Sequence, residues 1–152
     1  MSINGSRVIL GGIVAGIVIN VIEGVMNGVV LMKQWADQMV SLNRSPAGSI
    51  KQIIVLNLWG FAAGIMLVWL YAAIRGKFGP GPRTALGAGF FLWLTICGMG
   101  TAVPVILHIY RLDLALIGVA VELAEMLLAA LAGCYFYKEE AVTPARSEAA
   151  RA

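Results

Sequence analysis

Four long apolar stretches dominate the sequence, at residues 8–32, 50–74, 84–107 and 112–137. A helix needs about 20 mainly apolar residues to cross the hydrocarbon core of a bilayer, and each stretch is long enough. Each stretch is bracketed by Lys or Arg, as expected for helices whose charged ends remain in water. The sequence therefore predicts an all-α integral membrane protein, a bundle of four transmembrane helices.

The composition supports a membrane environment and argues against nucleic-acid binding. Hydrophobic residues make up 60% of the chain and charged residues only 12%, whereas a soluble domain is about a quarter charged. So few charged residues cannot coat the surface of a soluble protein of this size. We therefore expect the lipid bilayer to cover much of the protein surface. The formal charge of +3 is spread over the ends of the apolar stretches, without the basic stripe that nucleic acid requires.

The distribution of basic residues predicts the orientation of the bundle. An even number of spans places both termini on one side of the membrane, which then carries the larger share of Lys and Arg. Cytoplasmic loops carry this excess, so both termini are predicted to be cytoplasmic. Residues 1–138 are expected to form one domain, followed by a disordered cytoplasmic tail over residues 139–152, which is rich in Ala, Glu and Arg.

The connections between the stretches differ in character. Residues 75–83 read RGKFGPGPR, and the alternating Gly and Pro predict a tight turn between antiparallel neighbours. The first connection instead carries apolar residues at helical spacing, from Leu31 to Leu42. It is expected to extend the first helix or to form a short helix on the outer membrane surface.

Small residues and one proline predict how the helices pack. Gly pairs at four-residue spacing allow close approach of helix backbones in lipid, and such pairs occur at 12/16, 24/28 and 60/64. Pro104 is expected to kink the third helix. The segments Arg7–Gly11 and Arg83–Gly87 are alike, which favours a duplicated helical hairpin as one possible origin of the bundle.

Three glutamates inside the apolar stretches are the first candidates for a functional site. Ionisable groups in the bilayer core cost about 2.5–3.5 kcal/mol each on insertion scales and therefore mark function by default. Glu23 and Glu122 each lie roughly 13 Å from the outer helix end at a rise of 1.5 Å per residue, and Glu125 lies one turn deeper. Other polar residues at or above this layer are also candidates for ligand or proton binding: Asn20, Asn27, Asn57, Thr101 and His108.

The chemistry of these residues leaves several interpretations open. No Lys or Arg lies in the predicted core to neutralise the glutamates, so the carboxyl groups are protonated or hold a cation. They could equally cross-link helices by hydrogen bonds. A carboxylate-bound metal is a further alternative, but di-iron bundles use Glu-x-x-His pairs. Here the spacing is Glu-x-x-Glu (Glu122–Glu125) and the chain has one His, so no metal ligands are assigned.

Motifs for catalysis are missing from the sequence. It contains no GxSxG, HExxH or Walker loop, so we assign no catalytic residues and catalysis by this chain alone is disfavoured. Cys97 and Cys134 lie inside apolar stretches without a CxxC pattern and are interpreted as small packing residues. No cofactor is implied.

The run Trp69–Arg75, continued by Phe78–Ala85, resembles a signature of uncharacterised bacterial four-span small membrane proteins, of the form WLYAAIRxxFGPGPRTA. The Asn/Glu stretch of the first helix is similar too. The resemblance implies a bacterial inner-membrane location, and it carries no activity and no catalytic residues.

Three classes of function follow from these observations. The first is transport or binding of a proton, cation or small ligand at an acidic intramembrane site, with the chain as a homo-oligomer. The second is an accessory or structural subunit of a larger membrane protein complex. The third is a membrane enzyme that uses the glutamates to hold a metal.

Overall fold

A computed structural model describes residues 3–138 as a bundle of helices, and this part of the chain contains no strand. Four segments are long and apolar enough to cross a membrane: Gly5–Val30, Ile50–Phe78, Pro82–Ile106 and Leu112–Tyr135. The predicted fold class is confirmed, and the observed spans match the predicted ones to within a few residues. The predicted tail at 139–152 lies outside the described residues.

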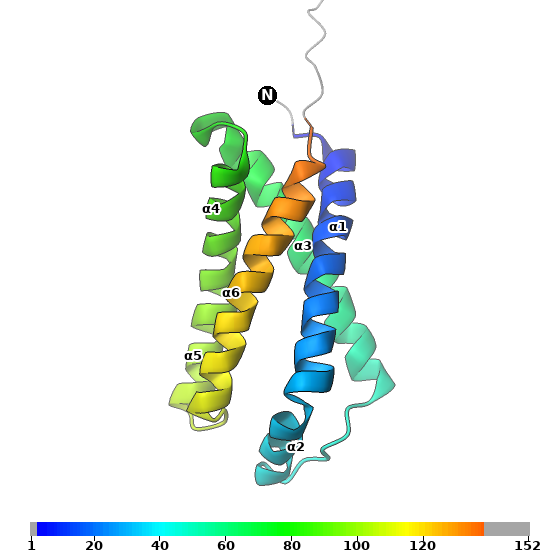
Figure 1. The fold of residues 1–152 in the computed structure, drawn as a ribbon, viewed down its shortest axis with the longest axis vertical. Helices are drawn as coiled ribbons and strands as arrows, with labels where there is room; N and C mark the ends of the chain where they lie inside the picture. The colour runs from blue at the N-terminus through cyan, green and yellow to red at the C-terminus, as the bar shows by residue number, and fades with distance from the viewer. Residues whose placement is uncertain (1–2, 139–152) are drawn as a thin grey trace, which may run out of the picture.

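The spans run alternately up and down (Figure 1), and two of them contain a π-helical turn. The elements in chain order are α1 (Gly5–Val25), η1 (Met26–Val30), α2 (Met32–Ser41), α3 (Ile50–Phe78), α4 (Pro82–Trp93), η2 (Leu94–Gly98), α5 (Met99–Ile106) and α6 (Leu112–Tyr135). The start of α1 and the end of α6 meet at one end of the bundle, where the Asn4 amide donates to the Tyr137 hydroxyl at 3.3 Å. We call this the termini end and the opposite one the α2 end.

Helix boundaries follow from local chemistry. Ser49 caps α3 in a capping box with Gln52, which satisfies two amides that have no partner within the helix. The turn between α3 and α4 passes through Gly79 and Gly81, whose φ angles of 82° and 132° are disfavoured for other residues. Pro82 then occupies the first turn of α4, where its missing amide costs nothing. The Gly-Pro run therefore turns the chain tightly between α3 and α4.

The core lies toward the termini end, where α1 packs on α3 and α6 through glycines. A Cβ atom on Gly64 would lie 2.5 Å from the Gly12 carbonyl oxygen, and one on Gly133 would lie 2.7 Å from that of Gly11. The expected 12/16 and 60/64 pairs thus lie in helix contacts. Gly24 and Gly28 face open space instead, so their predicted packing role is wrong for the single chain.

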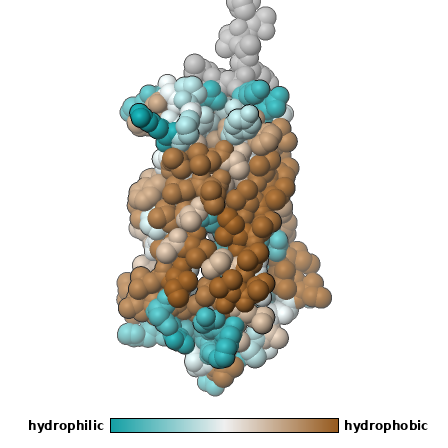
Figure 2. Space-filling view, in the orientation of Figure 1, coloured by the Kyte–Doolittle hydropathy of each residue, from teal (hydrophilic) through white to brown (hydrophobic). Residues whose placement is uncertain are grey.

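Packing loosens toward the α2 end. The first ten residues of α3, 50–59, are all exposed, and this half of the helix leans away from the others (Figure 1). In α1, no residue after Ile19 is buried. On the face shown in Figure 2, a broad apolar band lies between two hydrophilic ends, and some hydrophilic atoms appear within the band. The band is what lipid contact requires.

The two π-helical turns were not anticipated. Such turns insert an extra residue into a helix and occur frequently at functional sites. In the third span the departure from α geometry lies at Leu94–Gly98, before Pro104, which lies inside α5. The first span ends at Val30, and buried Leu31 separates it from α2. The first connection is therefore a separate short helix, one of the two forms expected for it.

Candidate functional site: a carboxyl cluster between α1 and α6

Three glutamates from two helices meet near the middle of the apolar band. The carboxyl groups of Glu23 on α1 and Glu125 on α6 lie close enough to interact with each other, and Glu122 is close enough to repel both electrostatically. The i, i+3 spacing of Glu122 and Glu125 places both on the side of α6 that faces α1. The structure thus brings together all three ionisable residues predicted inside the spans.

Two oxygen atoms of this cluster have no hydrogen-bond donor. Glu125 is 3% exposed, and the Oε2 atoms of Glu122 and Glu125 are buried without a partner among the described residues. A buried polar atom without a partner carries a desolvation cost of about 1–3 kcal/mol, and more when it is charged. The cluster is therefore incomplete as a purely structural hydrogen-bond network.

Cys97 is a member of the site that sequence reasoning missed. Its thiol lies close to the Glu122 carboxyl group, and it is a free cysteine on the π-helical turn η2. The third span therefore contributes to the cluster together with α1 and α6. The only available signal was its position one helical turn before Thr101, another predicted site residue.

Asn27 supports Glu23 from the other π-helical turn, η1. Its Nδ2 atom donates to Glu23 Oε2, and its Oδ1 atom accepts from the indole Nε1 of Trp35 at 2.7 Å. A continuous line of side chains therefore runs from α2 through Asn27 to Glu23 and Glu125.

The remaining asparagines lie at a helix contact, away from the carboxyl groups. Asn20 Nδ2 donates to the carbonyl oxygens of Gly16 at 2.8 Å and Asn57 at 3.2 Å. Its side chain fills the space above Gly60, where a Cβ would lie 2.6 Å from Asn20 Oδ1. Asn57 is exposed and donates to the Ile53 carbonyl. These two predicted site residues hold α1 against α3.

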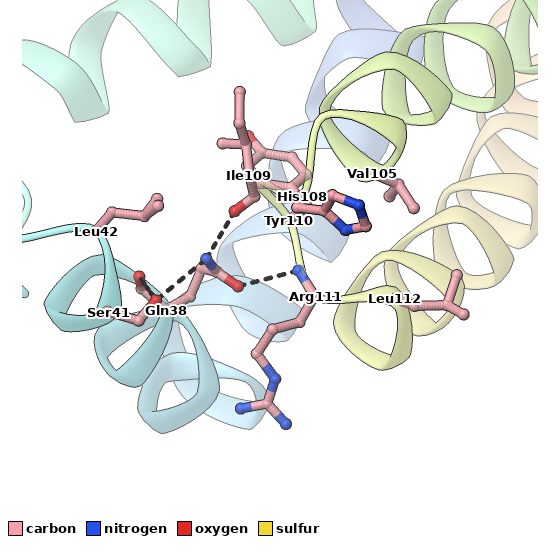
Figure 3. Close-up of a pocket in the computed structure, with 9 residues that line it drawn as sticks. All are labelled: Gln38, Ser41, Leu42, Val105, His108, Ile109, Tyr110, Arg111 and Leu112. Carbon is pink, nitrogen blue, oxygen red and sulfur yellow. Dashed lines mark hydrogen bonds between the residues drawn. The ribbon is translucent and has the colours of Figure 1, made fainter.

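Thr101 and His108 lie nearer the α2 end than the cluster. Thr101 is half-buried in α5. His108 is exposed with φ of 55° in the α5–α6 loop and borders an open hollow of about 520 Å³ (Figure 3). The structure does not bring His108 into the carboxyl cluster.

The electrostatic surroundings of the cluster contain no compensating cation among residues 3–138. Every Lys and Arg there lies in a connection or within a turn of a helix end. No group of three or more His, Cys, Asp and Glu side chains in this range is arranged to hold a metal ion. The glutamates are thus acidic groups in apolar surroundings without a positive partner from the described chain.

Comparison of the chain with known protein families, curated proteins and solved structures gave no match.

Proposed function

We propose that this chain is a small bacterial inner-membrane protein that binds a proton at Glu23, Glu122 and Glu125 and uses it in transport across the bilayer. The observation that carries this proposal is the pair of buried carboxyl oxygens without donors, one on Glu122 and one on Glu125, with Glu23 close by on the facing helix.

A proton is the ligand that this arrangement favours. Two carboxylates in contact in apolar surroundings repel each other, so the pair is stable when it shares a proton. Losing or gaining that proton changes the charge of the cluster without any need for a large cavity. A metal ion is supported less well, because the described carboxyl and thiol groups are not arranged to hold one.

A purely structural role for the glutamates is supported less well than proton exchange. Cross-linking glutamates should find donors for their buried oxygens, because an unsatisfied group in hydrocarbon is costly. Here Asn27 donates to Glu23, whereas one oxygen each of Glu122 and Glu125 has no donor. These oxygens are available to a transferred proton or to water that carries it.

The orientation is part of the same proposal. The termini end of the described bundle carries Arg7, Arg75, Lys77, Arg83 and Lys138, against four basic residues at the α2 end. By the positive-inside tendency the termini end is cytoplasmic and α2 lies on the outer side.

Replacement of Glu23 by Gln tests this function. Purified protein is reconstituted into vesicles that enclose a pH-sensitive dye, and an imposed pH gradient drives proton flux. Gln keeps the size and hydrogen bonds of Glu but cannot release a proton, so Glu23→Gln should reduce flux at least about tenfold. The Glu23→Asp variant, which retains a carboxyl group, should recover part of it. Wild-type flux in a folded Glu23→Gln variant would remove Glu23 from the proton path.

A further inference from the structure

The short helix α2 lies across the α2 end of the bundle and is fastened to the loop between α5 and α6. The Gln38 side chain is 2% exposed. Its Nε2 atom donates to the Ile109 carbonyl at 2.8 Å, and its Oε1 atom accepts from the Arg111 backbone amide at 3.1 Å. Figure 3 shows this side chain reaching from α2 to the loop. One buried glutamine thus joins two segments far apart in sequence.

A second contact lies beside the first and leads toward the carboxyl cluster. The Trp35 ring meets Tyr110 edge to face, with ring centroids 5.7 Å apart. The same indole donates to Asn27, which in turn donates to Glu23. Trp35 therefore connects the contact between α2 and the loop to the hydrogen bonds that lead to Glu23.

The bundle is loosely packed beneath α2. In α1 no residue after Ile19 is buried, and in α6 none between Ala115 and Glu125 is buried. These two segments converge on the cluster from the α2 end. α2 bridges their ends, since it follows the first span after the single residue Leu31 and is bound to the loop that precedes α6.

The connections of α2 would allow it to move as a unit. The π-helical turn η1 and Leu31 separate it from α1, and residues 42–49 between α2 and α3 form turns and bends rather than helix. Beside it, the hollow of about 520 Å³ already opens to the surface between α2 and the loop.

We propose that α2 is a movable cover over the proton path from the α2 end to Glu23, with Gln38 as its latch. This inference rests on the proposed function. In the closed state, Gln38 holds α2 against the loop, and the Trp35 indole donates a hydrogen bond to the Asn27 side chain. When the latch opens, Trp35 leaves Asn27, and water reaches the Asn27–Glu23 pair.

Replacement of Gln38 by Met tests the latch, because Met has a similar length and no amide. Spin labels are placed on Leu42→Cys of the segment after α2 and His108→Cys of the loop, both of which line the hollow, with Cys97 and Cys134 replaced by Ala. The matched control is Gln34→Met, the same change at an exposed position of α2. Distances between the labels are measured for each variant in this background, and proton flux into vesicles is measured for the same Gln38 and Gln34 variants with all natural cysteines kept.

If α2 is a movable cover, the distance between the two labels should become longer and more broadly distributed in Gln38→Met. Proton flux should also increase on the order of tenfold, as expected when two ordinary hydrogen bonds are lost. Gln34→Met should leave both readouts unchanged. An unaltered distance distribution in Gln38→Met would overturn the latch. A longer distance with unchanged or slower flux would overturn the cover, while the proposed function would stand as long as Glu23→Gln blocks flux. Flux that is unchanged in both Gln38→Met and Glu23→Gln would instead reject the proposed function.

Discussion

Replacing Glu125 by Gln is expected to abolish most proton flux through the reconstituted protein, with a decrease on the order of a hundredfold. Glu125 is the most buried of the three glutamates, at 3% exposure, and it meets Glu23 from the opposite helix. The amide fills the same space but cannot accept and release a proton. Flux is measured with an enclosed pH-sensitive dye.

The control for this substitution is Asp113→Asn, which neutralises an exposed carboxyl group on the same helix. Asp113 lies in the first turn of α6 and pairs with Arg111 at the surface, so this variant should retain flux. Thermal unfolding in detergent separates lost function from lost folding, because Glu125→Gln should melt close to the wild type. Equal flux in the wild type and a folded Glu125→Gln variant would refute the assignment.

The second large effect is expected at the glycine contact between α1 and α3. A Cβ on Gly64 would lie 2.5 Å from both the Gly12 oxygen and the Gly16 nitrogen, and backbone atoms cannot move aside as a side chain can. Gly64→Ala should therefore force the helices apart and destabilise the bundle by about 1–3 kcal/mol or more. The effect is large because close packing is a principal force between helices in lipid.

The matched control is Gly87→Ala in α4, where an added Cβ meets nothing within 4 Å. This change should be neutral or stabilising, because Ala is favoured over Gly in a helix by up to about 1 kcal/mol. Circular dichroism during heating in detergent compares the two variants. If Gly64→Ala unfolds at the same temperature as Gly87→Ala, the close contact between α1 and α3 is absent in solution.

The spans could be predicted from sequence because hydropathy and length decide whether a helix crosses a membrane. The turn at Gly79–Gly81 was predictable for a similar reason, since its glycines and prolines restrict the backbone locally. The i, i+3 spacing also placed Glu122 and Glu125 on one helix face. Each of these features depends on residues that are near one another in the chain.

Features that depend on helix rotation and crossing were not predictable. Asn20 shares a helix with Glu23, yet it turns toward Gly60 because α3 approaches α1 closely there. Cys97, which lies close to Glu122, is on the π-helical turn η2, and this turn leaves no mark in the apolar sequence. The hydrogen bond from Trp35 to Asn27 likewise requires α2 to fold back after Leu31.

The most direct test of the central claim is infrared difference spectroscopy of the protein in lipid while the pH is changed. Proton binding at the Glu23–Glu125 pair predicts a carbonyl band from a protonated carboxyl group that appears and disappears with pH and that Glu125→Gln removes. A spectrum without such a band, or a band that persists unchanged in Glu125→Gln and in Glu23→Gln, would contradict the account.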